Sequence, residues 1–287
     1  MNITEKIVLG TAQFGMDYGI TNVTGKPTEK EIFNIFSLAW ENGIRHFDTA
    51  PGYGSEPLLG KFIKSNGLQK EAKVLTKISS LKGLSDYRNN IRTSVETSLK
   101  YLGCPIDVLF FHNPSDSSLL KKDPAFFENL MVEYMDSTLG VSVYDPHEVE
   151  KLTGSQFELA LQFPFNVLDR RFENISMAKG KRYARSIFLQ GLLASKNGLK
   201  QDSPKALLAL QNDYHSKLEE NKLDPVQFAI SFIANSKNID HFLVGVDTVS
   251  QLRYILNLSL DNHNQIQLSD SFQFGFDTNW LDPRTWY

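Results

Sequence analysis

The sequence predicts an α/β protein folded as a single-domain (β/α)8 TIM barrel, and three observations support that prediction. The chain has 287 residues, close to the ~250 that such a barrel takes as one domain. Eight short apolar runs alternate with segments of helical spacing, and strict alternation implies parallel strands with right-handed crossovers. No glycine fingerprint for dinucleotides follows the first run, which counts against a Rossmann fold. An open doubly wound sheet remains the alternative.

The first half of the chain supplies four strands. Residues 7–12 form an apolar run, and helical spacing follows over residues 28–42, where Gly43 provides a C-terminal stop. A second strand ends at Asp48, and Ser55 can cap a helix that reaches Gly67. The third strand covers 73–77 and precedes a long amphipathic helix over 85–102. Residues 106–112 are almost continuously apolar, as expected for a strand covered on both faces.

The second half repeats the pattern less regularly. Helical spacing at 124–135 precedes a strand at 139–143, and Pro146 fits the first turn of the next helix. Strands are predicted at 159–162 and 183–189, with a basic, helical segment between them. Residues 190–203 are irregular. Two helical patterns, 204–220 and 225–235, lead to a last strand at 241–245 and a helix over 248–260. We expect residues 262–287 to form a tail over the site, within one domain spanning 1–287.

Composition narrows the class of protein. The net charge is −3 without blocks of like charge, so binding to nucleic acid or to an anionic membrane surface is not expected. No apolar leader or membrane-length run is present. The lone cysteine, Cys104, fits a reducing compartment, so we expect a cytoplasmic protein, monomeric or a small homo-oligomer. The histidines show no metal-ligand spacing, and no metal is expected.

Ionisable side chains follow three neighbouring strands where a barrel would direct them at one site. They are Asp48 with Tyr53 beyond it, Lys77 and His112. Each alone has an ordinary explanation: a turn cap, a packed aromatic, a solvated cation and a hydrogen-bonded core residue. A lysine can lower the pKa of a nearby phenol by roughly 1–3 units, and a paired carboxylate can hold that lysine in place. Together the four suit protonation of an oxygen on which negative charge develops, as in carbonyl reduction.

The segment from Phe47 to Glu56, FDTAPGYGSE, resembles the most diagnostic segment of the aldo-keto reductase superfamily. Further matches follow in order over residues 5–260: TK ending the third strand, LKYLG and IDVLFFHNP around the fourth, GVS, Gln162 with Asn166, QGLL and Val244-Gly245. The resemblance implies a barrel that binds a nicotinamide cofactor, usually NADP(H), across the carboxyl ends of the strands.

The resemblance also assigns roles to residues. It makes Tyr53 the general acid, Lys77 and Asp48 its tuning pair, and His112 the residue that places the substrate carbonyl. The residues that it places at the cofactor are Gly10, Thr11, Ala12, Ser142, Gln162, Arg185, Ser186, Phe188, Gln190, Gly191, Gly245, Val246, Asp247, Gln251 and Arg253. Phe14 and Tyr18, and Trp280 and Trp286 of the tail, are candidates to contact substrate or simply to pack.

Three departures from the family pattern bear on the cofactor. Val143 stands where an asparagine is usual, so one hydrogen bond to the carboxamide is lost. Arg185 replaces a tyrosine that stacks on the nicotinamide, and its charge would favour the reduced form. Gly245 replaces the cation that usually grips the 2′-phosphate, which leaves Arg253 as the nearest basic candidate and keeps NAD(H) possible.

These observations predict NADP(H)-dependent reduction of an aldehyde or ketone. Resemblance of the Arg185–Gly191 string and of the tail to a bacterial sugar and polysaccharide branch hints at a carbohydrate-like substrate. Two alternatives stay open: an NAD-linked sugar dehydrogenase, and a nicotinamide-binding regulatory subunit without physiological turnover.

Overall fold

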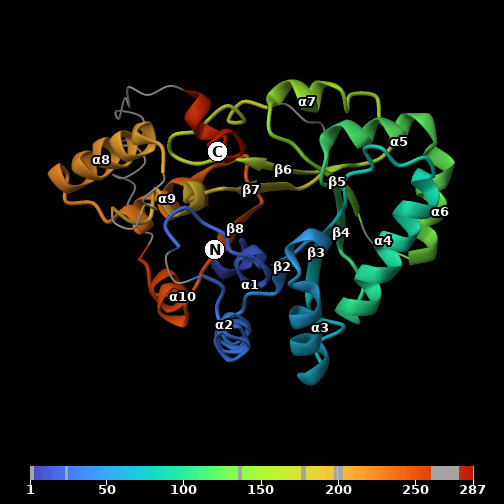
Figure 1. The fold of residues 1–287 in the computed structure, drawn as a ribbon, viewed down its shortest axis with the longest axis horizontal. Helices are drawn as coiled ribbons and strands as arrows, with labels where there is room; N and C mark the ends of the chain where they lie inside the picture. Colours follow the sequence, from blue (N-terminus) through green and yellow to red (C-terminus); the bar gives the residue numbers. More distant parts are fainter. Residues whose placement is uncertain are drawn as a thin grey trace.

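The computed structural model describes residues 3–22, 25–134, 138–175, 179–196, 199, 203–259 and 278–286. Their strands form a closed parallel barrel in which each strand pairs with the next in sequence and the last pairs with the first. Figure 1 shows the strands at the centre and the helices around them. The predicted (β/α)8 barrel is therefore confirmed. The strands are β1 (Ile7–Gly10), β2 (His46–Asp48), β3 (Lys73–Ile78), β4 (Val108–Phe111), β5 (Thr138–Ser142), β6 (Ala160–Pro164), β7 (Arg182–Arg185) and β8 (His241–Gly245).

Most of the predicted helices are present, with small shifts at their ends. Side-chain caps at Thr28, Asp86, Asp224 and Thr248 start four of them by accepting a backbone N–H from the first turn. The helices are α1 (Ala12–Gly15), α2 (Glu29–Glu41), α3 (Glu56–Ser65), α4 (Tyr87–Leu102), α5 (Leu119–Lys122), α6 (Pro124–Tyr134), α7 (Pro146–Glu150), α8 (Lys205–Glu220), α9 (Pro225–Asn235) and α10 (Val249–Leu256). None of these helices has the length and apolar character needed to cross a bilayer.

The core lies mainly between the barrel and its ring of helices. The apolar stripe predicted on α2, Ile32, Ile35, Phe36 and Ala39, is fully buried. Phe36 makes an edge-on contact with Phe47 of β2 at 5.9 Å between ring centroids. A smaller group of side chains fills the barrel interior, including Leu75, Phe110 and Tyr183. Both faces of the strands are therefore packed with apolar side chains. The buried polar side chains of the strands lie at or near the carboxyl ends, where a barrel of this kind carries its site.

The connection between β6 and β7 departs from the prediction. The basic segment expected to be helical forms bends and turns over its described residues, 165–175 and 179–181. β7 also ends at Arg185, earlier than predicted, because Ser186 has a left-handed φ of 56° that an extended strand cannot continue. Leu189 and Gln190 share this conformation, at φ 45° and 54°. The chain therefore turns sharply at the mouth of the barrel.

The tail can be placed only in part. Residues 260–277 lie outside the described residues, so the prediction that the tail covers the site stays a prediction for them, as does the single-domain assignment. In the described end, the indole N–H of Trp286 donates to the Trp280 carbonyl at 3.0 Å. The Arg284 guanidinium of this end lies over the ring of Tyr144, which follows β5, at 3.4 Å from the ring centre.

Candidate active site

A buried ion pair links the ends of β2 and β3. The Lys77 ammonium donates to both carboxylate oxygens of Asp48, at 2.8 and 2.9 Å, and to the Thr49 carbonyl at 2.9 Å. The side chains of Lys77 and Asp48 are 1% and 3% exposed. Gln162 of β6 donates its amide N–H to Asp48 at 2.8 Å. Two buried charges are thus neutralised and hydrogen-bonded, as a buried ion pair requires.

Tyr53 lies against this pair. It ends a short 3-10 turn, Pro51–Tyr53, and the Lys77 ammonium is 4.8 Å from the centre of its ring. The ring of His112, the residue after β4, meets the Tyr53 ring edge-on at 6.3 Å between centroids. The structure therefore brings together all four residues to which catalytic roles were assigned.

The turn that carries Tyr53 is fixed by backbone packing and buried hydroxyls. A Cβ on Gly15 would lie 1.7 Å from the Tyr53 carbonyl oxygen, so only glycine allows the two backbones to approach this closely. Thr11 donates its hydroxyl to the Asp48 carbonyl at 2.9 Å, and its oxygen is 2.7 Å from the Ser55 hydroxyl. The end of β1 thereby positions the loop after β2.

The electrostatics of Tyr53 differ from the sequence prediction. Lys77 was expected to lower the pKa of the phenol, but burial first, and then the charge of Asp48, raise the pKa of Tyr53 above its ordinary value. The physical reason is that the buried phenol lies close to the Asp48 carboxylate, whose negative charge disfavours the phenolate, while Lys77 is paired with that carboxylate at 2.8 and 2.9 Å. Tyr53 is therefore a neutral O–H donor at neutral pH.

His112 is also held neutral. Burial, reinforced by Lys77, lowers the pKa of His112 to about 4. A neutral imidazole can hydrogen-bond an oxygen without adding a charge to the site. The pair of a neutral phenol and a neutral imidazole suits donation to a carbonyl oxygen.

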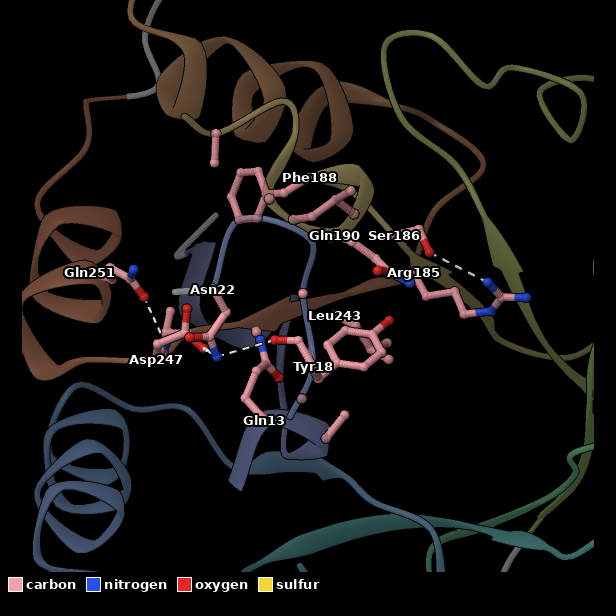
Figure 2. Close-up of a pocket in the computed structure, with 18 of the residues that line it drawn as sticks. Gln13, Tyr18, Asn22, Arg185, Ser186, Phe188, Gln190, Leu243, Asp247 and Gln251 are labelled. Atoms are coloured by element: carbon pink, nitrogen blue, oxygen red, sulfur yellow. Dashed lines mark hydrogen bonds between the residues drawn. The ribbon is translucent and has the colours of Figure 1, made fainter. Parts of the chain in front are cut away.

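A pocket at the mouth of the barrel includes Asp48 and Tyr53 of this cluster in its wall. Figure 2 shows another part of that wall, from Gln251 and Asp247 to Arg185. Asp48, Tyr53 and Tyr18 lie along one part of it, and Asp247, Gln251 and Tyr254 along another. Of the residues assigned to the cofactor, all line this pocket except Ser142 and Arg253. The wall combines small residues at the end of β1 with the turn after β7, so the backbone leaves room there for a bound molecule. Other residues of the wall include Gln13, Asn22, Ala194 and Val226.

Several predicted contacts lie elsewhere. Phe14 is fully buried and packs edge-on against Phe36, so it belongs to the core and not to the pocket wall. Trp286 is 3% exposed and packs in the core, and neither it nor Trp280 lines the pocket. Arg253 lies on an exposed face of α10. Ser142 sits at the end of β5, 3.4 Å from the side-chain oxygen of Gln162.

Sequence reasoning missed Tyr144, a residue beyond the end of β5. The guanidinium groups of Arg185 and Arg284 lie over its ring, 4.0 and 3.4 Å from the ring centre. Arg185 also donates to the Val143 carbonyl at 3.1 Å. Tyr144 thus contacts both Arg185 and the end of the tail, but it does not line the pocket. Only the position of Tyr144 at a strand end could have signalled a role.

The fold is a (β/α)8 barrel, and its candidate site places a phenol beside a buried ion pair. No group of three or more His, Cys, Asp or Glu in the described parts of the chain is placed to hold a metal ion. The Aldo/keto reductase family model matches residues 6–270. The chain therefore belongs to the aldo/keto reductase family, whose members are NAD(P)H-dependent oxidoreductases.

Individual relatives are more distant. An aldo-keto reductase of Bacillus subtilis, YhdN, is 26% identical over 66% of this chain and 58% of its own length. The D-threo-aldose 1-dehydrogenase of a Pseudomonas species is 30% identical over 46% of this chain and 50% of its own. A Schizosaccharomyces pombe protein named for a voltage-gated potassium channel subunit beta is 32% identical over 41% of this chain and 37% of its own. The chain thus spans between about a third and three fifths of these relatives.

A solved structure supports the fold. The glycerol dehydrogenase AKR11B4 from Gluconobacter oxydans superposes with a TM-score of 0.65, covering 93% of this chain and 90% of that one. The sequences are 21% identical, so the likeness concerns the fold alone.

Proposed function

We propose that the protein reduces the carbonyl group of an aldehyde or ketone, with Tyr53 as the general acid. The observation that carries the proposal is the position of Tyr53, against the buried Asp48–Lys77 pair and on the wall of the pocket that also holds most of the residues assigned to the cofactor. A nicotinamide dinucleotide, when bound, supplies a hydride to the carbonyl carbon. The C=O π bond breaks as the C–H bond forms, and its electron pair moves to the oxygen.

Side chains of the protein bind the carbonyl oxygen and supply its proton. Tyr53 donates its hydroxyl proton to the developing alkoxide, and the product is an alcohol. The raised pKa of Tyr53 does not prevent this transfer, because an alkoxide is a stronger base than a phenolate. His112 orients the carbonyl by hydrogen bonding, and Lys77 and Asp48 hold the phenol in place. The phenolate then regains a proton from water.

We propose a sugar or sugar derivative as the class of substrate. The sequence hint of a sugar or sugar derivative agrees with a relative named as an aldose dehydrogenase. For the cofactor, the sequence favoured NADP(H) and left NAD(H) open, and that choice depends on the end of the pocket farther from Tyr53. A cytoplasmic location and a monomeric or small homo-oligomeric state are part of the proposal.

The test is Tyr53→Phe, with Tyr101→Phe as the matched control because Tyr101 is an exposed tyrosine on α4. Both variants are assayed with NADH and with NADPH against aldoses and an activated aromatic aldehyde. We expect Tyr53→Phe to lower kcat by roughly 10²–10⁴-fold and to leave the Kd of the cofactor nearly unchanged. Retained turnover in Tyr53→Phe would refute the assignment.

A second candidate is a nicotinamide-binding partner subunit, which the name of the S. pombe relative favours. It predicts cofactor binding without turnover on any carbonyl of the panel, together with a stable hetero-complex in size-exclusion chromatography of cell extracts. Turnover that depends on Tyr53 would exclude it.

A further inference from the structure

The pocket has two chemically different ends. The hydride donor must lie beside the carbonyl whose oxygen Tyr53 protonates, so the nicotinamide belongs near Tyr53. Because a dinucleotide is extended, its adenosine half belongs at the opposite end. That end is lined by Asp247, Gln251, Tyr254 and Val226. Figure 2 shows Asp247 and Gln251 on the side of the pocket away from Arg185.

Among the described wall residues, the one positive charge lies near the catalytic candidates. Arg185 is the one lysine or arginine among the described residues that line the pocket. Its field acts on Tyr53, Tyr18 and His112, which places it near the catalytic cluster. Arg253, the basic candidate from the sequence, points from an exposed face of α10 and is absent from the described wall. No described lysine or arginine therefore lines the end of the pocket where a 2′-phosphate would bind.

The adenosine end carries a carboxylate instead. Asp247 accepts a hydrogen bond from the Asn22 amide at 3.3 Å, and its backbone N–H donates to the Gln251 side chain at 2.6 Å. These contacts hold Asp247 on the wall just beyond β8. Burial raises the pKa of Asp247, and among the described residues the charged group that acts on it is the acidic Asp17. A dianionic phosphate here would face a carboxylate without a counter-ion, whereas a ribose diol could donate hydrogen bonds to it.

We propose that Asp247 makes the protein selective for NAD(H) over NADP(H), by accepting hydrogen bonds from the adenosine ribose and repelling a 2′-phosphate. This inference rests on the proposed function, because it places the nicotinamide beside Tyr53. It differs from the preference for NADP(H) that the sequence suggested. Gln251 and Asn22 act as positioning residues for the carboxylate.

The experiment is a binding titration that requires no substrate. The intact protein is titrated with NADH and with NADPH, and Kd is followed by quenching of tryptophan fluorescence and by calorimetry. We expect NADH to bind at least about 10-fold more tightly than NADPH. The isosteric Asp247→Asn should reduce that ratio at least about 5-fold, mainly through tighter binding of NADPH, because it removes the charge and keeps the shape.

Two further variants sharpen the test. Asp247→Asn combined with Gln251→Arg places a cation at the same wall and should reverse the preference toward NADPH. Asp213→Asn, on exposed α8 and paired with Lys217 at 2.9 Å, has the same charge change away from the pocket and should leave the ratio unaltered. Tighter binding of NADPH by the unaltered protein, or an unchanged ratio in Asp247→Asn, would overturn the inference.

The outcome also separates this inference from the proposed reaction. Preference for NADPH with turnover that depends on Tyr53 would overturn the role of Asp247 and leave the reaction standing. If instead the protein prefers NADH, Asp247→Asn weakens that preference, and turnover survives in Tyr53→Phe, the role of Asp247 would stand and the proposed reaction would fall. Absence of binding by either cofactor would overturn both.

Discussion

Replacing Lys77 by methionine should be among the most damaging single changes in the barrel. The substitution keeps most of the side-chain volume but leaves the Asp48 carboxylate, 3% exposed, without its cation. Removing one partner of a buried ion pair typically costs about 3–5 kcal/mol in the free energy of unfolding. With an unfolding entropy of ~2.1 cal/mol/K per residue, the 287 residues give ~0.6 kcal/mol/K. The expected fall in Tm is therefore about 5–8 °C.

The same strand provides a matched control. Lys73 pairs with Asp107 at 3.0 Å, but its side chain is 47% exposed and that of Asp107 27%. Asp107 also keeps a hydrogen bond from the Val74 backbone N–H. Lys73→Met should thus cost no more than about 1 kcal/mol. Urea unfolding followed by circular dichroism gives both values.

A double variant tests the cause. Asp48→Asn combined with Lys77→Met removes both charges, so its cost should be smaller than that of Lys77→Met alone. Two results would show that the buried, unpaired charge is not the origin of the lost stability. In one, Lys77→Met lowers the free energy of unfolding no more than Lys73→Met does. In the other, the losses from Asp48→Asn and Lys77→Met simply add in the double variant.

Two other predictions concern pH and backbone packing. Burial, with His241 beside it at 4.5 Å between ring centroids, lowers the pKa of His46 to about 4. Since the folded state binds this proton less readily than the unfolded chain, the free energy of unfolding should be constant above pH ~6.5 and fall toward pH ~4, by up to about 1.4 kcal/mol per pH unit for one group. His46→Gln should flatten the fall in urea titrations, and the exposed His147→Gln should not; equal slopes would contradict the assignment. Gly15→Ala should lower kcat at least about 10-fold because the new methyl displaces the Tyr53 backbone. The control is Gly52→Ala, in the loop that carries Tyr53, because Gly52 has open space around it. Equal kcat values for the two variants would show that the close approach of Gly15 to the Tyr53 backbone does not matter for turnover.

The sequence predicted the barrel because parallel strands buried on both faces give apolar runs that are hard to mistake. It also predicted that Asp48, Lys77 and His112 lie together, since each stands near the end of a strand and such ends converge in a closed barrel. These features depend on local pattern and topology alone.

Other features depend on contacts that the sequence does not display. Ser186 takes a left-handed φ where glycine would be expected, and this ends β7 early. The raised pKa of Tyr53 results from the balance between burial and a neutralised ion pair, which needs distances. Phe14 lies in the short helix α1 and Tyr18 three residues beyond its end, and only the packing of Phe14 on Phe36 shows which of them faces the pocket.

The order of the strands places the two groups of proposed site residues in different parts of the chain. Asp48, Tyr53, Lys77 and His112 all come from the β2–β4 stretch, whereas Asp247 and Gln251 follow β8. If both proposals hold, substitutions after β8 can change the dinucleotide that is bound while Tyr53 stays intact. Such a division lets cofactor use follow the metabolic supply of the host over evolutionary time, at little risk to the chemistry.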